Sequence, residues 1–131
     1  MAANMQAAAA SMCDAGGPEI QVMRVRVKPA DVIDFSAWVC NTAARIRVVV
    51  TDSTSVDQVI IDQTGLSKAT ATLPSLSAGT FTLLWSYLVA STPWQTRTEV
   101  AINGTNRFVH RKGSDSNDPF LRGFLIIEVV P

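Results

Sequence analysis

The sequence predicts an all-β fold, an antiparallel β-sandwich of immunoglobulin-like or jelly-roll kind with eight or nine strands. From residue 19 onward, apolar residues recur with a period of two, in runs rich in β-branched and aromatic residues. Clusters of Gly, Pro, Asn, Asp and Ser divide these runs at regular spacing. No segment between the runs has the length and period of a crossover helix, so the pattern indicates a sandwich and argues against a parallel sheet.

Residues 1–18 are predicted to form a short N-terminal helix or a flexible arm ahead of the sandwich. The segment 2–13 is rich in alanine and has no β-branched residue, which gives it a high helix propensity. A Gly-Gly-Pro sequence then stops the helix. The chain is therefore expected to contain a terminal segment, 1–18, and a single β-sandwich domain, 19–131.

Nine segments have the composition and spacing of strands. Side chains alternate between the two faces of a strand, so every second residue of the clearest runs is assigned to the core. The residues assigned to the core in this way are Ile33, Phe35, Ala37, Val39, Ile46, Val48, Val50, Phe81, Leu83, Trp85, Tyr87 and Val89. The predicted strands are 20–27, 31–40, 44–51, 57–62, 68–73, 79–90, 95–102, 106–112 and 121–130.

Two of the predicted strands, 79–90 and 121–130, are apolar on both faces. Apolar area beyond a few hundred Å² is seldom left in water, so something is expected to cover the second face. The N-terminal helix or a long loop is one candidate cover, and another subunit of a homo-oligomer is the other. The residues expected at a subunit interface are Leu84, Leu88, Phe124, Ile126 and Val130.

The composition argues against binding to nucleic acid or to membranes. The 131-residue chain has 11 Lys and Arg against 11 Asp and Glu, so the charges cancel. No run of apolar residues approaches the about 18 that a membrane span requires. With 47% hydrophobic and 17% charged residues, the surface is light in charge, which fits burial of part of it in a homo-oligomer.

Cys13 and Cys40 have neither a CxxC spacing nor a Cys/His companion, so no metal site is expected from them. Their expected state is a reduced pair, since a disulfide would require an oxidising compartment. The first 18 residues contain no Lys or Arg and differ from a signal peptide. The default location is therefore the cytoplasm, and export by a non-classical route is the alternative.

The usual catalytic residue sets are missing from the sequence, so no enzyme is predicted. His110 is the only histidine, it has no nearby cysteine, and neither a GxSxG turn nor a His-rich metal motif occurs. A small hydrolase that uses paired aspartates is a further alternative. The candidate pairs are Asp31 with Asp34, Asp57 with Asp62, and Asp115 with Asp118.

The loop at 114–118 concentrates oxygen donors. Its residue types form turns, and they are also the ligands that calcium prefers. No cofactor is predicted, and calcium at this loop is the alternative. Trp94 follows a Ser-Thr-Pro turn and is the tryptophan most expected to be exposed. The predicted ligand-binding residues are Trp94, Arg97, His110, Ser114, Asp115, Asn117 and Asp118.

Most arginines lie within predicted strands, whereas most aspartates lie in turns. Arg45 and Arg47 alternate with core residues and are expected to point outward. Outward arginines on one sheet could form a positive panel for an anionic ligand or an acidic partner. The alternative is that they solvate exposed strands and protect sheet edges.

The Asn-Gly pair at 103–104 is a strong hairpin signal. With a two-residue turn, Arg107 would face the core and Phe108 the solvent, and an odd-length turn reverses both assignments. Burying Phe108 is favourable by about 2 kcal/mol whereas burying Arg107 is costly, so the odd-length turn is expected. His110 would then lie near Thr98, toward the end of a core-facing row.

These observations together predict a non-catalytic binding or assembly module, a homo-oligomeric structural or recognition protein. Its ligand would be a protein or a carbohydrate. The main alternative is a lectin-like carbohydrate-binding module, with or without calcium, at the 114–118 loop.

Overall fold

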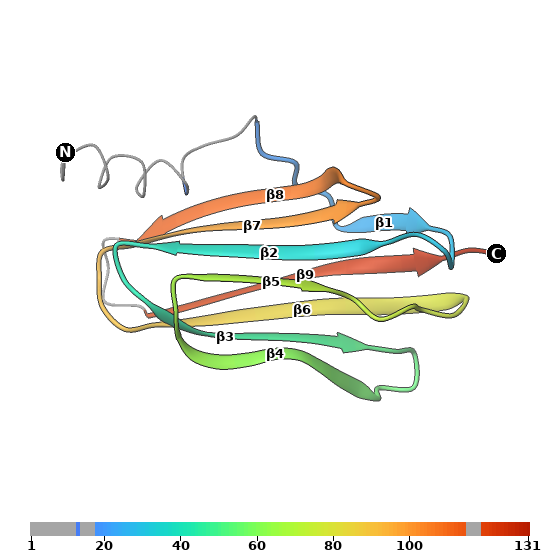
Figure 1. Ribbon diagram of the computed structural model, residues 1–131, viewed down its shortest axis with the longest axis horizontal. Helices are drawn as coiled ribbons and strands as arrows, with labels where there is room; N and C mark the ends of the chain where they lie inside the picture. Colours follow the sequence, from blue (N-terminus) through green and yellow to red (C-terminus); the bar gives the residue numbers. More distant parts are fainter. Residues whose placement is uncertain (1–12, 14–17, 115–118) are drawn as a thin grey trace.

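The computed structural model describes residue 13 and residues 18–114 and 119–131, and this part of the chain forms a sandwich of two β-sheets (Figure 1). Five strands form one sheet in the order β1-β9-β6-β3-β4, and four form the other in the order β5-β2-β7-β8. The predicted all-β sandwich is confirmed. The strands are β1 (Arg24–Val27), β2 (Ile33–Cys40), β3 (Ala44–Thr51), β4 (Asp57–Leu66), β5 (Lys68–Thr72), β6 (Gly79–Val89), β7 (Trp94–Ile102), β8 (Thr105–Ser114) and β9 (Phe120–Val129).

All nine predicted strands are present, and most of their ends agree within two residues. Two ends differ by four residues. β1 begins only at Arg24, because Ile20, at the predicted start, forms an isolated bridge with Val109 on the other sheet. β4 continues to Leu66, because its ladder with β3 extends as far as Ala44. In both cases pairing with a distant strand decides the end, which local alternation does not reveal.

The strand connections explain how two sheets arise from one run of strands. β3–β4 and β7–β8 pair directly as hairpins, and the other connections pass from one sheet to the other. β1 pairs parallel to β9, with Val25 beside Ile127, whereas the other paired strands are antiparallel. The parallel pair joins the first and last strands of the sandwich along one edge of the five-stranded sheet.

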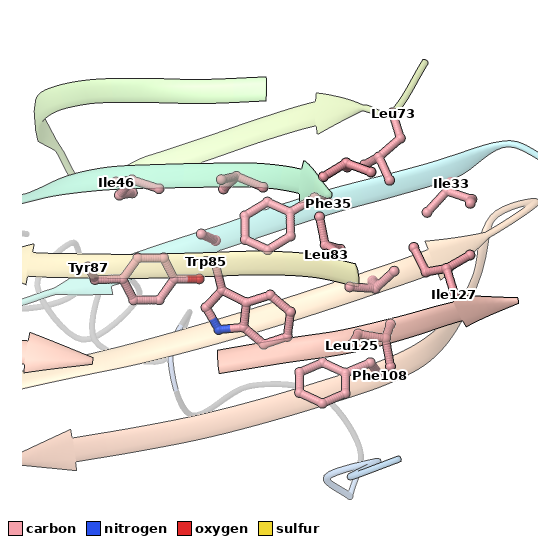
Figure 2. Packing of buried hydrophobic residues seen from close by; sticks show 14 of the residues in the cluster. Ile33, Phe35, Ile46, Leu73, Leu83, Trp85, Tyr87, Phe108, Leu125 and Ile127 are labelled. Carbon is pink, nitrogen blue, oxygen red and sulfur yellow. The ribbon is translucent and has the colours of Figure 1, made fainter. Parts of the chain in front are cut away.

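The space between the sheets is filled by apolar side chains around a group of aromatic rings (Figure 2). The Trp85 ring centroid lies 5.9 Å from that of Phe35 and 5.2 Å from that of Phe108. Tyr87 of β6 and Thr98 of β7 share a 2.6 Å hydrogen bond between their hydroxyl groups, from one sheet to the other. Burial raises the pKa of the Tyr87 phenol, so this hydroxyl stays protonated and links the sheets at every ordinary pH.

Trp85 fits into the core because its neighbour on β9 is a glycine. Gly123 lies directly beside Trp85 in the β6–β9 ladder. A methyl group at residue 123 would come within 2.3 Å of atoms of the indole ring, far inside van der Waals contact. The other residues assigned to the core from sequence are buried, except that Phe81 is only partly buried.

The β7–β8 hairpin has a different turn from the one expected. The turn contains two residues, 103–104, and both have the positive φ of a type I′ turn. The expected odd-length turn is therefore wrong. A β-bulge at Arg107 then restores the favourable faces, so that Phe108 pairs with Val100 and is buried while Arg107 is exposed. The energetic argument was correct about the faces, and a bulge satisfies it in place of a longer turn.

The predicted N-terminal helix falls mainly outside the described residues. Cys13, the described residue of that segment, is buried against the sandwich. Within the described part of the chain, no helix has the length and hydropathy needed to cross a membrane.

Candidate functional site

The outer face of the five-stranded sheet carries an apolar row that runs across four strands. Val59 of β4, Val49 of β3, Leu84 of β6 and Phe124 of β9 are successive neighbours in the ladders. Leu84 is 42% exposed, Phe124 44% and Val59 52%, while Val49 is buried among them. An apolar row of this kind leaves hydrophobic area in water, which soluble proteins usually cover with a partner.

Beside the apolar row lies a polar row, in which a serine separates two arginines. Arg47 of β3 and Arg122 of β9 are the ladder neighbours of Ser86 on β6. The short serine side chain lies between longer ones, and a shallow hollow of about 310 Å³ opens at this point. Leu84 and Asp57 also line this hollow. The hollow therefore combines apolar walls with charges of both signs.

Two acidic groups of the face are neutralised within the chain. Asp62 accepts two hydrogen bonds from Arg45, at 2.9 and 3.0 Å, and lies 3.6 Å from Arg47. The bonds from Arg45 hold the pKa of Asp62 below its ordinary value of 3.8. Glu128 is likewise held between two arginines of β1, at 2.6 and 3.4 Å.

Asp57 and Arg122 differ from these groups, because neither forms an ion pair within the described residues. Asp57 accepts a 2.7 Å hydrogen bond from the hydroxyl of Thr51. The Arg122 guanidinium lies over the ring of Phe120, 4.7 Å from its centroid. The hollow thus has one acid and one base that are paired neither with each other nor with another charged group among the described residues.

An N-terminal arm, of which Cys13 and residues 18–20 are described, is attached to the four-stranded sheet at the end of β2 and along the edge strand β8. Cys13 forms a disulfide with Cys40 at the end of β2, with Cα atoms 6.3 Å apart. Ile20 exchanges two backbone hydrogen bonds with Val109 of β8, at 2.9 and 3.0 Å. The expected reduced cysteine pair is therefore wrong, because the fold returns the arm to the end of β2.

Glu19 fastens the arm to β8. Its carboxylate accepts a 2.8 Å hydrogen bond from the backbone N–H of Arg111 and a second one from the side chain of Gln21. These bonds, the Arg111 bond first, hold the pKa of Glu19 below its ordinary value of 4.5.

Acid is expected to loosen the arm. Because the folded-state pKa of Glu19 is lowered, its ionised form stabilises the arm above about pH 4.5, and this contribution is lost as the pH falls through the folded value. Hydrogen-exchange protection of the Val109 and Arg111 amides should therefore fall in acid, while the amides of β6 stay protected. Glu19→Gln should lack this acid step and show weakened protection at pH 7. An unchanged acid step in Glu19→Gln would assign it to another group.

A buried ion pair lies on the outward side of β7. Arg97 and Glu99 project outward from β7 yet are only 8% and 9% exposed, and they pair at 2.8 Å. The Asn106 side chain donates a further 2.8 Å hydrogen bond to Glu99. The Trp38 ring lies beside the Arg97 guanidinium, 5.5 Å from it. The second donor on Glu99 offsets the cost of removing the pair from water.

The arm does not cover the apolar strands β6 and β9. The N-terminal segment was one candidate cover for them, but its described residues contact the other sheet. Leu84, Leu88 and Phe124 remain exposed on the outer face of the five-stranded sheet, and Ile126 is half-buried beside them. Val130, also half-buried, lies one residue past the end of β9. The predicted interface residues are thus largely together, on a face that the described residues leave open.

Three of the residues predicted to bind a ligand, Trp94, Arg97 and His110, lie on the β7–β8 hairpin, but not on one face. Trp94 is 2% exposed, so the expectation that it is exposed is wrong. β7 starts at Trp94, and the alternation of the strand turns Trp94 inward and Arg97 outward. His110 lies opposite Thr98 as expected, half-buried, with its ring 6.3 Å from that of Phe108. Trp94 and Arg97 therefore cannot line one surface site.

The oxygen-donor loop is only partly described. Ser114 is the last residue of β8 and pairs with Trp94 in the ladder. Asp115, Asn117 and Asp118 lie outside the described residues. Among the residues that the structure describes, no group of three or more His, Cys, Asp or Glu could hold a metal ion. Calcium at this loop stays a prediction from the sequence.

Asp31 and Asp34, the first pair considered for hydrolysis, form structural hydrogen bonds. Asp31 accepts a bond from the backbone N–H of Lys28 at 2.8 Å and one from the side chain of Asn103 at 2.9 Å. The Lys28 bond is the main reason why the pKa of Asp31 lies below its ordinary value. Asp34 accepts a hydrogen bond from the hydroxyl of Thr72. A general acid at neutral pH needs a raised pKa, and the Asp31 shift is in the opposite direction.

Four residues of the open face were not recognised as such from the sequence: Val59, Asp57, Phe120 and Arg122. Arg122 had a usable signal, because it precedes Phe124 by two residues and must share its face. Phe120 was placed in the loop before the last strand. The roles of Val59 and Asp57 depend on the pairing of β4 with β3, which has no local signal.

Comparisons with known proteins do not add to the geometry. No protein-family model matches the chain, and no curated protein matches its sequence. The function is therefore argued from the two outer faces.

Proposed function

We propose that the protein is a non-catalytic assembly module whose copies associate through the outer face of the five-stranded sheet. The observation that carries this proposal is the exposed apolar row across β4, β3, β6 and β9. Leu88 and Phe120, 47% and 37% exposed, extend the apolar area along the same face. Continuous apolar area on a β-sheet is the usual basis of subunit contact.

The distribution of polar residues supports a protein partner. Arginines and acids surround the apolar row, which matches the apolar centre and polar rim of protein interfaces. The described residues of the arm are attached to the other sheet. They leave Leu84, Phe124 and Val59 of the five-stranded sheet exposed. The lectin-like alternative loses its main aromatic platform, because Trp94 is buried.

The proposal extends to the compartment. A disulfide persists in an oxidising environment, whereas the cytoplasm keeps thiols reduced. The Cys13–Cys40 bond therefore favours work in an oxidising compartment over the cytoplasmic location expected from the sequence.

A charge in the apolar row should abolish the association. Wild-type protein is expected to self-associate in light scattering coupled to size-exclusion chromatography, and Leu84→Asp to elute as a monomer. Burying an unpaired carboxylate at the centre of an interface costs at least about 2 kcal/mol, or roughly thirty-fold in Kd.

Val32→Asp is the matched control. Val32 is 48% exposed, similar to Leu84, but lies in the loop before β2. This variant should associate like the wild type. A wild-type protein that stays monomeric up to millimolar concentration, or a Leu84→Asp protein that still associates, would contradict the proposal.

A further inference from the structure

We propose that the association is two-fold symmetric and that Asp57 of one copy pairs with Arg122 of the other. This inference rests on the proposed function and names the contact that orients the two copies. It starts from the charges of the open face. Asp62 and Glu128 are each neutralised by arginines of their own chain, whereas Asp57 and Arg122 form no ion pair within the described residues.

Opposite charges at two places on one surface are what a self-complementary interface requires. In a two-fold contact, if residue i of one copy meets residue j of the other, then j also meets i. Asp57 and Arg122 both line the hollow beside the apolar row. A single symmetry operation would thus form two ion pairs, each bringing a guanidinium fork to a carboxylate.

The strand ladders place a suitable axis on the apolar row. Asp57 pairs with Thr51 on β4–β3, and Arg122 lies beside Ser86, so the two charges are three strands apart and four residues apart along β6. The midpoint between them falls between Val49 and Leu84. We place a two-fold axis through this midpoint, in the plane of the interface and perpendicular to the line that joins the two charges. Rotation about this axis brings Asp57 of each copy against Arg122 of the other. The same axis places the centre of the apolar row of one copy against the centre of the same row in the other copy.

The axis also fixes how the sheets cross. Three strand spacings are about 14 Å and four residues along a strand are about 14 Å, so the line between the charges is diagonal to the strands. The two-fold axis is perpendicular to this line and therefore follows the other diagonal. Rotation by 180° about it makes the strands of the two copies cross at about 90°, which is one of the two common sheet packings.

The arrangement with the axis along β6 is disfavoured by charge. Arg47 and Arg122 are the two neighbours of Ser86 in the same ladder row. An axis parallel to β6 would place Arg122 of one copy against Arg47 of the other. Like charges facing each other in an interface are repulsive, so this alternative is selected against.

The test is a charge swap between two variants. Asp57→Arg alone would oppose two arginines across the interface, and Arg122→Asp alone would oppose two aspartates. Each variant by itself is expected to raise the Kd of self-association at least ten-fold. In a mixture of the two variants both ion pairs are restored in the heterodimer, so native mass spectrometry should show a 1:1 species that neither variant forms alone.

Arg107→Asp is the control for charge reversal away from the face. Arg107 is exposed at the bulge of the β7–β8 hairpin, on the other sheet. This variant should self-associate with the wild-type Kd. Circular dichroism and thermal melting of each variant show that it is folded, and recovery on mixing shows that its interface is intact.

The outcomes separate this inference from the proposed function. A wild-type monomer at all concentrations overturns both. Wild-type association that survives Asp57→Arg and Arg122→Asp unchanged, while Leu84→Asp abolishes it, overturns the ion pair and leaves the face. Loss of association in both variants without recovery in the mixture overturns the reciprocal pairing.

Discussion

Gly123→Ala is expected to lower the free energy of unfolding by about 3 kcal/mol, toward the upper end of the effects of overpacking a core. The added methyl group would come within 2.3 Å of the Trp85 indole, which is already held between Phe35 and Phe108. Neither the backbone of β9 nor the ring can move without breaking a ladder or a core contact. Chemical denaturation followed by tryptophan fluorescence measures the change.

A double-mutant cycle assigns the effect to this contact. Trp85→Phe removes the part of the ring that would meet the methyl group, so Gly123→Ala should cost less in that background. Gly113→Ala on β8 is the matched control, since its methyl group would meet its nearest neighbour, the Trp94 carbonyl oxygen, at 3.3 Å. A Gly123→Ala effect as small as that of Gly113→Ala would contradict the proposed clash.

Loss of the disulfide is expected to have an effect of similar size. In the chain-entropy description, a bond between residues 27 positions apart stabilises the folded state by about 3.5 kcal/mol. The double variant Cys13→Ser/Cys40→Ser should therefore unfold at lower denaturant concentration than the oxidised wild type. The arm should also lose hydrogen-exchange protection at Val109, because its covalent attachment is gone.

Treatment with a reductant distinguishes the effect of losing the disulfide from any other effect of the two substitutions. Dithiothreitol should lower wild-type stability to that of the double variant and leave the double variant unchanged. Self-association should persist in both, because the arm lies on the four-stranded sheet and the open face on the other. Equal stability of the oxidised wild type and the double variant would contradict a stabilising bond.

The two outer faces of the sandwich differ. On the four-stranded sheet, to which the arm is attached, the outward Arg97–Glu99 ion pair is almost fully buried. The five-stranded sheet keeps an apolar row in water. An exposed apolar row on one sheet face is what the proposed assembly would bury.

The strands and the core were predictable, because both depend on alternation within a few residues. Trp85 and Tyr87 are buried as the period of two required, and Leu84 and Leu88 are exposed on the other face. Phe108 was assigned to the correct face from its burial energy alone. The length of the β7–β8 turn was not predicted correctly, because a two-residue turn with a bulge and an odd-length turn place the side chains on the same faces.

The contacts of the site could not be predicted in the same way. Trp94 was expected in a loop, and it is buried because β7 begins at that residue. Asp57 and Arg122 share a hollow only because β4 and β9 lie on either side of β3 and β6. The sequence contains no signal for this strand order.

The sequence by itself determined that the chain forms eight or nine strands, which side chains enter the core, and that two strands are apolar on both faces; the described residues form nine. Only the tertiary structure decided the order of the strands, the Cys13–Cys40 bond, and which outer face stays open. The physical reason is the distance along the chain over which the interactions act. Alternation and turn chemistry act between neighbours along the chain, whereas strand order, arm docking and charge pairing depend on residues that meet only after the two sheets have packed.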